Sequence, residues 1–308
     1  MPNVLENNSA HNLFDPNVFI GKEIGNITLI SLLGRGAMGA VFIGYQKSLK
    51  RKVAVKIFPK LSPESMKMRL RFRDEAETVA VLNHPNIVPV FDMGANDELI
   101  YIIMQLIDGE DLRSLLKRHL LHPVASKRLL PLQSSLSIMI HILDALSYAH
   151  EEGVIHRDIK PANIIMDNRS NRPYLADFGI AQSTLSEKKQ TNIILGTPLY
   201  ISPEQVCGSD VNNRSDIYSS GVVLFELIAG KLPLSTKSLE EILKIKMYNP
   251  DSLFSCSPSA ASPLIDNDLE AIIKKAIASN IEDRYLTSRK FHDDLVAYYK
   301  QVFPEGNK

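Results

Sequence analysis

The sequence predicts an α+β fold with two lobes, a small β-rich lobe with one main helix followed by a larger α-helical lobe. Up to about residue 104, β-branched and other apolar runs alternate with turn residues, which is typical of antiparallel strands. After Gly109 the apolar residues recur mostly at helical spacing. A chain of 308 residues is long enough to build two lobes with sizeable cores.

Each lobe is predicted from local patterns. Strands are expected between Ile24 and Ile57, at 87–91 and at 99–104, with one helix at 64–82 because its apolar residues fall on one face. The later segments predicted to be helical are 111–120, 132–151, 215–229, 238–246, 267–278 and 288–301. Short strands are predicted near 154–155, 164–166 and 174–176, and the Ser-, Ala- and Pro-rich stretch at 255–263 is predicted to be a loop.

The composition argues against several classes of function. The chain has 35 basic and 35 acidic residues, so we expect no nucleic-acid partner. Cys207 and Cys256 form no CxxC pair, which predicts neither a disulfide framework nor a zinc site and suits the cytoplasm. Residues 1–12 show no signal-peptide pattern, and the apolar run at 221–229 is too short to span a bilayer, so no membrane segment is expected.

A glycine cluster stands between two of the predicted strands. The run from Gly34 to Val41 has the pattern GxGxxGxV, in which glycines let the backbone approach phosphate oxygens. A dinucleotide-binding fold uses similar glycines but needs a helix directly after them, whereas Val41-Phe42-Ile43 favours a strand. We therefore predict a hairpin that covers phosphates, with an ordinary glycine-rich hairpin as the alternative.

A lysine follows the apolar strand residues 53–55. A charge at Lys56 is costly to bury unless it is paired or bound to an anion. Glu75 lies on the apolar stripe of the predicted 64–82 helix and is the candidate partner. Such a pair would direct Lys56 toward the α- and β-phosphates of a nucleotide, and the alternative is an ordinary solvent-facing lysine.

Two polar motifs follow in the second half of the chain. His156 to Asn163 matches the HRDxxxxN catalytic loop of protein kinases, and Asp177 to Gly179 matches their DFG motif. Together with the glycine cluster, Lys56 and Glu75, these motifs stand in the order found in that family. From about residue 24 to 300 the chain therefore resembles a protein kinase catalytic domain, which implies the bilobal protein kinase fold.

The resemblance implies a role for each motif residue. Asp158 is implied as the catalytic base, Lys160 as the group that neutralises γ-phosphate charge, and Thr197 as the residue that orients both. Asn163 and Asp177 would bind Mg²⁺, with Mn²⁺ as an alternative, and ATP would be the phosphate donor. The ATP-binding residues implied by the same register are Leu33, Gly34, Arg35, Gly36, Ala37, Met38, Gly39, Val41, Ala54, Lys56, Glu75, Gln105, Ile107 and Asp111.

A further segment, residues 196–204, resembles the GTxxYxxPE substrate segment of Ser/Thr kinases. Ser202 stands where alanine is commoner. By the resemblance, Glu204 would form a structural ion pair with Arg284, and Asp216 would hold the backbone of the catalytic loop. Protein substrates are therefore implied.

Motifs at 37–38, 177–181 and 202–205 together resemble the bacterial eukaryotic-like (Hanks-type) Ser/Thr protein kinases. The implied activity is that of a non-specific Ser/Thr protein kinase. The implied layout is a leader at 1–23, an N-lobe at 24–104, a hinge at 105–111, a C-lobe at 112–302 and a tail at 303–308.

The resemblance also implies regulation. Thr191 lies five residues before Gly196, and Arg157 beside the catalytic aspartate would bind a phosphate on this segment. We therefore predict that Thr191 is autophosphorylated between two copies in a transient homodimer, which raises activity. The alternative is that Thr191 is an ordinary loop hydroxyl.

Two other functions and one loop stay open. A pseudokinase would serve as a binding or scaffold module, but Lys56, Asp158 and Asp177 are all present. A small-molecule kinase of related fold is disfavoured by the segment at 196–204. Residues 117–131 form a long basic link between the predicted helices at 111–120 and 132–151. This link is interpreted as a solvated loop or, alternatively, as a docking surface for an acidic partner.

Overall fold

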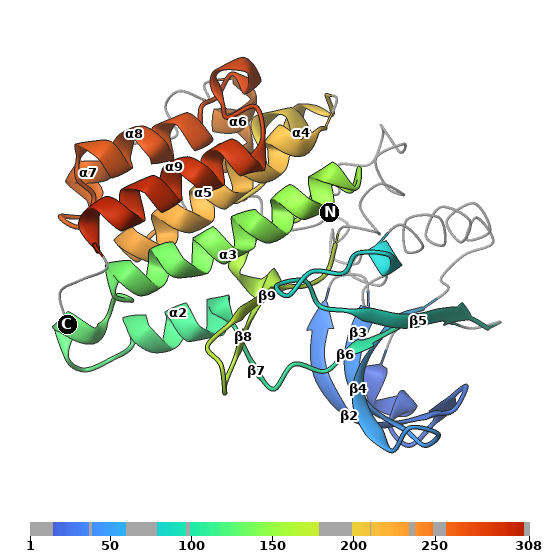
Figure 1. Cartoon of the computed structure of the whole chain (residues 1–308). Coiled ribbons are helices and arrows are strands. Elements are labelled where there is room, and N and C mark those ends of the chain that lie inside the picture. Colours follow the sequence, from blue (N-terminus) through green and yellow to red (C-terminus); the bar gives the residue numbers. More distant parts are fainter. Residues whose placement is uncertain are drawn as a thin grey trace, which may run out of the picture. The chain divides into compact units, whose positions relative to one another are not determined.

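A computed structural model of the chain divides into two compact units (Figure 1). The structure describes residues 15–36, 39–59, 79–96, 99–178, 199–209, 211–233, 238–248 and 257–304. The first unit comprises residues 1–80 and 89–106, and the second comprises 81–88 and 107–308. The segment 81–88 thus belongs to the second unit, although it lies between two parts of the first along the chain.

The first unit is built on one antiparallel sheet with the strand order β1-β2-β3-β4-β6-β5. A 3₁₀ turn, η1 (Pro16–Phe19), precedes it. The strands are β1 (Glu23–Ile24), β2 (Ile27–Gly36), β3 (Gly39–Gln46), β4 (Arg51–Pro59), β5 (Val90–Ala95) and β6 (Leu99–Gln105).

Two of the sequence predictions for this region need comment. The strand predicted at 87–91 is wrong in position: β5 begins at Val90, and Ile87 makes only an isolated bridge to Leu175. Of the helix predicted at 64–82, Val79 and Ala80 are helical, and residues 60–78 lie outside the described residues.

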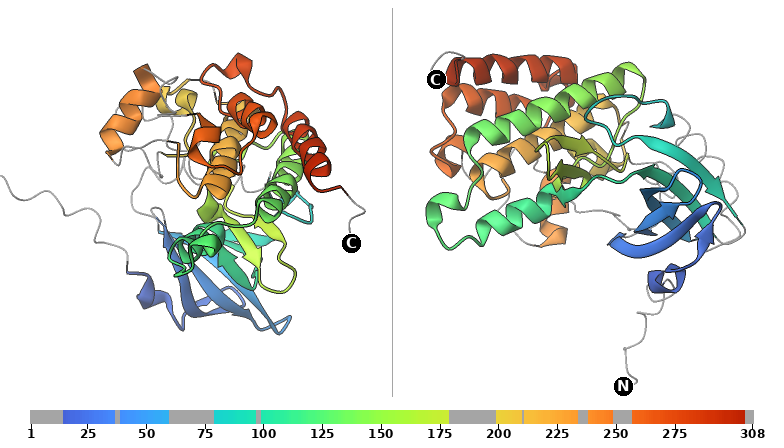
Figure 2. Two further views of the ribbon diagram at one scale, coloured as in Figure 1. Left: turned by 90° about the vertical axis from the view of Figure 1, so that its left-hand side faces the viewer. Right: turned by 60° about the horizontal axis from the view of Figure 1, so that its bottom comes forward.

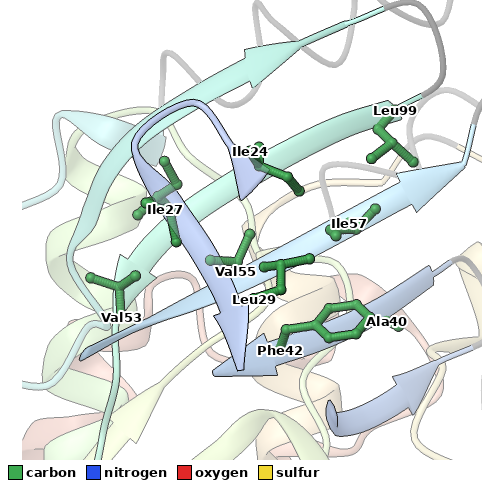
Figure 3. Close-up of a cluster of buried hydrophobic side chains, with 10 residues drawn as sticks. Ile24, Ile27, Leu29, Ala40, Phe42, Val53, Val55, Ile57 and Leu99 are labelled. Atoms are coloured by element: carbon green, nitrogen blue, oxygen red, sulfur yellow. The ribbon is translucent and has the colours of Figure 1, made fainter. Parts of the chain in front are cut away.

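One face of this sheet carries an apolar cluster (Figure 3). Side chains alternate between the two faces of a strand, so Val53, Val55 and Ile57 all point to the same face of β4. They pack with Leu29 and Phe42, which are fully buried. Burial of each such side chain stabilises the sheet by about 1.5–3 kcal/mol. The same alternation places Ala54 and Lys56 on the opposite face of β4.

The second unit is mainly helical. Its helices and 3₁₀ turns are α2 (Leu112–Leu120), η2 (Ala125–Lys127), α3 (Leu132–Glu151), η3 (Pro161–Asn163), α4 (Pro203–Cys207), α5 (Asn213–Ala229), α6 (Leu239–Tyr248), α7 (Pro258–Ala261), α8 (Asn267–Ala276), η5 (Ile281–Asp283) and α9 (Ser288–Val302). The long helix α3 lies beside α5 and α9 in all views (Figures 1 and 2). The predicted helix at 132–151 is therefore the central packing element of this unit.

Helix α3 is also apolar enough to be tested as a membrane span. By length and composition, the helical stretch 125–151 is the one described helix that could cross a bilayer, and half of its apolar window is buried within the structure. Leu136, Met139, Ile142 and Leu143 are completely buried in α3, which packs against α5 and α9. This is the pattern of a core helix.

Three short strands form a second sheet, β7 (Gly109–Asp111), β8 (Ile164–Asp167) and β9 (Pro173–Leu175). A Cβ on Gly109 would lie 1.9 Å from the carbonyl oxygen of Met166, so only glycine fits at this crossing. Because β8 pairs with β9, Asn163 and Ala176 are brought together, and the N–H of Ala176 donates to the Asn163 carbonyl at 2.9 Å. This hairpin positions the two ends of the candidate site.

Some predictions for the second unit are wrong. Residues 154–155 form no strand, and α7 lies inside the stretch predicted to be a loop.

The basic link at 117–131 is ordered by its own hydrogen bonds: Nε of Arg128 donates to the carbonyl of His122 at 3.0 Å, and Nδ1 of His119 lies 3.0 Å from the carbonyl oxygen of Lys127.

Candidate active site

Three predicted site residues meet at the carboxylate of Asp158. Lys160 Nζ lies 2.6 Å from Asp158 Oδ2, and Asn163 Nδ2 donates to the same oxygen at 3.0 Å. Asn163 also donates to the main-chain carbonyl of Asp158 at 2.7 Å, which is possible because Asn163 ends the 3₁₀ turn η3. The carboxylate therefore has a cation and an amide donor fixed on it.

His156 connects this carboxylate to the DFG motif. Its Nε2 faces the Ala176 carbonyl at 3.0 Å, and its Nδ1 accepts from the N–H of Asp158 at 3.2 Å. These partners require the neutral tautomer with the proton on Nε2. Complete burial lowers the pKa of His156, which favours that neutral form, and its ring packs 4.5 Å from Phe178. The histidine thus packs and braces the loop.

Asp216, in the first turn of α5, holds the backbone of the catalytic loop. Its carboxylate accepts from the N–H groups of His156 and Arg157 at 2.8 and 2.7 Å, and Nε2 of His150 lies at 2.8 Å. Burial by itself would raise the pKa of Asp216, but the contacts with His150 and His156 outweigh it and lower the pKa. Arg157 has a φ of 66°, so these bonds offset a strained left-handed conformation that costs about 1–3 kcal/mol.

Gln205, which sequence reasoning did not select, holds the other side of Arg157. Its Nε2 donates to the carbonyl of Arg157 at 2.9 Å. Its Oε1 accepts from the N–H and the hydroxyl of Ser202 at 3.1 and 3.0 Å. The signal in the sequence was the capping-box spacing of Ser202 and Gln205 at the start of α4.

Glu204 and Arg284, predicted to pair, form a two-pronged ion pair. Arg284 donates to the two carboxylate oxygens of Glu204 at 2.8 and 2.9 Å, and its side chain is completely buried. Its remaining donors reach the carbonyls of Arg214, Ala278 and Ser279. Burial would raise the pKa of Glu204, but the contact with Arg284 outweighs it and lowers the pKa. The pair ties α4 to the C-terminal end of η5.

The two predicted metal ligands, Asn163 and Asp177, lie at the two ends of the β8–β9 hairpin. Asn163 uses its Nδ2 group on Asp158, while its Oδ1 accepts no hydrogen bond among the described residues. Asp177 is half-buried with a φ of 59°. The described residues contain no group of three His, Cys, Asp or Glu that could hold a metal. An amide oxygen and a carboxylate, completed by phosphates, nevertheless fit Mg²⁺, which takes few protein ligands.

In the first unit, the glycine-rich segment is a hairpin. Gly36 pairs with Gly39 and Gly34 with Val41, and β3 rather than a helix follows the glycines. A Cβ on Gly39 would lie 2.0 Å from the carbonyl oxygen of Ile57, so glycine is required there for close packing. Arg35 forms an exposed ion pair with Asp15 at 3.3 Å.

The register of the sheet brings several predicted ATP-binding residues to one face. Lys56 pairs with Val41 on β3, and Ala54 pairs with Met104 on β6. Residues paired across antiparallel strands point to the same face, and so do residues two apart on one strand. Val41, Ala54, Lys56 and Met104 therefore share the face opposite the apolar cluster.

Four other predicted residues have different surroundings. Leu33 is 55% exposed on β2, and the N–H of Gln105 donates to the carbonyl of Pro89 at 2.9 Å. Ile107 is buried in the second unit. Asp111, predicted to bind ATP, caps α2 by accepting from the N–H of Ser114 at 3.0 Å. The predicted residues that lie outside the described part of the chain are Ala37, Met38, Glu75, Thr191 and Thr197.

Comparison with known proteins identifies the family of the chain. Residues 27–295 match the family model of the protein kinase domain, and the chain belongs to that family. It is 36% identical to the serine/threonine-protein kinase PknB of Mycobacterium tuberculosis over 293 residues, which is 93% of this chain and 44% of that protein. It is 35% identical to PrkC of Bacillus subtilis over 283 residues, 90% of this chain and 41% of that protein.

Another relative is Pkn1 of Myxococcus xanthus, at 35% identity over 90% of this chain and 38% of that protein. The chain thus spans about 40% of the length of these curated relatives. The crystal structure of the PknI kinase domain of Mycobacterium tuberculosis superposes with a TM-score of 0.68 at 29% identity, covering 90% of this chain and 98% of that one. Fold, motifs and relatives together define a bacterial Hanks-type Ser/Thr protein kinase domain.

Proposed function

We propose that this domain transfers the γ-phosphate of Mg²⁺-bound ATP to Ser and Thr hydroxyls of protein substrates. The observation that carries the proposal is the Asp158 carboxylate, which has Lys160 at 2.6 Å and Asn163 at 3.0 Å. Phosphoryl transfer depends mainly on positioned groups and charge neutralisation, and this cluster supplies both.

Asp158 would orient the acceptor hydroxyl and take its proton as the hydroxyl oxygen bonds to the γ-phosphorus and the bond to the β-phosphate oxygen breaks. Lys160, already fixed on Asp158, would neutralise charge on the transferred group. Asp216 and Gln205 would keep the base in place, because they bind the N–H and the carbonyl of the preceding residue, Arg157.

Each unit carries groups that we propose for binding ATP or its metal. Phosphates would be bound by the glycine hairpin of β2 and β3 and by Lys56 on β4. Gln105 would contact adenine through its carbonyl, because its N–H already donates to Pro89. Asn163 and Asp177 would hold Mg²⁺, which supplies charge neutralisation for the phosphates when bound.

A direct assay tests this proposal. The purified protein is incubated with labelled ATP, Mg²⁺ and histone as a generic protein substrate, and the product is hydrolysed for phosphoamino-acid analysis. We expect label on Ser and Thr. Absence of transfer with retained nucleotide binding would instead support the pseudokinase function. Transfer only to small molecules would support a small-molecule kinase of related fold.

We also propose that the kinase is regulated through Thr191 and that two copies meet transiently for this reaction. Arg157 supports the proposal, because it directly precedes Asp158 and its backbone is held at both ends. A phosphate bound by its guanidinium would order the segment that carries Thr191.

A further inference from the structure

The segment Leu199–Ile201 is held in place by side chains rather than by a helix or strand. Nζ of Lys246 donates to the carbonyls of Leu199, at 2.9 Å, and of Ile201. The hydroxyl of Ser219 donates to the carbonyl between them, that of Tyr200, at 2.8 Å. Three consecutive carbonyls therefore receive their hydrogen bonds from α5 and α6.

Lys246 occupies an unusual place for a lysine. It is 1% exposed and stands four residues after Ile242, on the face of α6 that is buried. An apolar residue would be expected there, because burying an amine is costly unless its donors are satisfied. Its two carbonyl partners satisfy two of the donors, which indicates that the site is built around the hydrogen bonds.

These bonds also determine where Tyr200 points. The hydroxyl of Tyr200 donates to Glu226 at 2.6 Å, while the carbonyls on either side of the tyrosine are bound to Lys246. Immediately after this segment, Ser202 is tied through Gln205 to the catalytic loop. The path of Leu199–Ile201 is thus defined relative to Asp158 within the same unit.

We infer that Lys246 is a positioning residue for the protein substrate: its amine sets the path of Leu199–Ile201 and through it the affinity for the polypeptide that carries the acceptor hydroxyl. The inference rests on the proposed kinase function, in which this segment is the substrate platform. Among the described residues, Nζ of Lys246 bonds only to the carbonyls of Leu199 and Ile201 and to no nucleotide-binding or catalytic group, so its effect should fall on the protein substrate.

The amine can do this in either charge state. Among the described residues, the ionisable groups near it are Glu204 on α4 and Tyr218 on α5, whose ring lies 5.3 Å from Nζ and also packs against Arg284. Burial lowers the pKa of Lys246 to about 7. A neutral amine still has two N–H donors, which equals the number of carbonyls it serves, so the positioning survives deprotonation.

The test is Lys246→Met, which keeps the length and apolar stem of the side chain and removes the donors. Because the two hydrogen bonds that hold the segment are lost, we expect the KM for histone to rise about tenfold or more. The KM for ATP and the slow hydrolysis of ATP by water should stay within about twofold. Lys244→Met is the matched control, because Lys244 is two residues away on α6, is exposed and forms an ion pair with Glu240.

The outcomes separate this inference from the proposed function. An inactive wild-type protein would refute the kinase function itself. An active wild type with an unchanged KM for histone in Lys246→Met would overturn the role of Lys246, and so would equal losses in histone transfer and ATP hydrolysis. If Lys246→Met does not fold, Ser219→Ala removes the neighbouring bond to Tyr200 without altering α6. An unchanged KM for histone in that variant would also overturn the inference.

Discussion

At the scale of single residues, the carboxylate of the candidate base, Asp158, is held in place by its neighbours in the catalytic loop. Lys160 and Asn163 both bind Asp158, and His156 accepts from its N–H. The side chain is 20% exposed, so a substrate hydroxyl can still reach it. Its neighbours therefore orient the group without closing it off.

Asp158→Asn should retain the fold and reduce turnover by about 10² or more, because the amide cannot take up the substrate proton. Initial rates with labelled ATP, together with melting temperatures, would measure both properties. Asp293→Asn is a matched control, since Asp293 is an exposed carboxylate on α9. Near-normal turnover in Asp158→Asn would remove Asp158 from the mechanism.

Lys246 should also make stability depend on pH. Its pKa is about 7 in the folded protein and about 10.4 in the unfolded chain, so between these values the unfolded state binds more protons. The contribution of this residue to the free energy of unfolding therefore increases as pH rises from about 7 to about 10, by a few kcal/mol at most.

Urea unfolding of wild type and Lys246→Met at pH 6.5 and pH 9 measures this effect, because other titrating groups cancel in the difference. The free energy of unfolding of the wild type minus that of the variant should be larger at pH 9 than at pH 6.5. Parallel behaviour of the two proteins at both pH values would mean that Lys246 keeps an ordinary pKa.

At the scale of elements, the first turn of α5 supports the catalytic loop through one buried carboxylate. Asp216 receives two main-chain N–H groups and lies against His150. The interaction joins residues about 60 positions apart. Removal of this carboxylate should therefore destabilise the catalytic loop and α5 together.

Asp216→Ala should lower the free energy of unfolding by about 3–5 kcal/mol, because it leaves buried donors without an acceptor. Urea unfolding would give the loss, and hydrogen exchange at 155–158 should become faster. Glu282→Ala is the control: Glu282 is 72% exposed in its pair with Arg214, so the change should stay below about 1 kcal/mol. Equal effects of the two substitutions would contradict a special role for Asp216.

The basic link at 117–131 is a second element with a clear test. Neutralising Arg118, Lys127 and Arg128 should change the free energy of unfolding by about 1 kcal/mol or less, since Arg118 is 64% exposed in its pair with Glu110. Peptide turnover should also be unaffected. A loss of affinity for a whole protein substrate, with peptide turnover intact, would favour the docking surface over the solvated loop.

At the scale of the whole molecule, the proposed regulation requires two copies. We expect mass spectrometry to find phosphate on Thr191 after incubation with ATP and Mg²⁺, and Thr191→Ala should slow turnover several-fold, because a phosphate bound by Arg157 orders the segment. Asp158→Asn protein alone should stay unmodified, yet it should acquire the phosphate when wild-type protein is added. A fully active enzyme without phosphate anywhere in 183–197 would defeat the idea.

Much of the fold was predictable because its signals are local. The glycine hairpin followed from the strand-forming residues after Gly39, and α3 from a sustained helical period. The strand expected at 87–91 was displaced because Ile87 is apolar for a different reason: it is buried in the second unit and bridges Leu175. A short apolar run does not reveal which neighbour buries it.

The sequence by itself determined the family, the order of its motifs and the residues that meet at Asp158, because those residues stand within a few positions of one another. Only the tertiary structure decided the roles of Gln205 and Lys246, whose partners lie more than 40 positions away. Those partners are main-chain carbonyls, which every residue type possesses and no sequence pattern marks. The sequence does not distinguish a lysine that faces water from one that binds two buried carbonyls. The packing of α4, α5 and α6 determines which of the two Lys246 is.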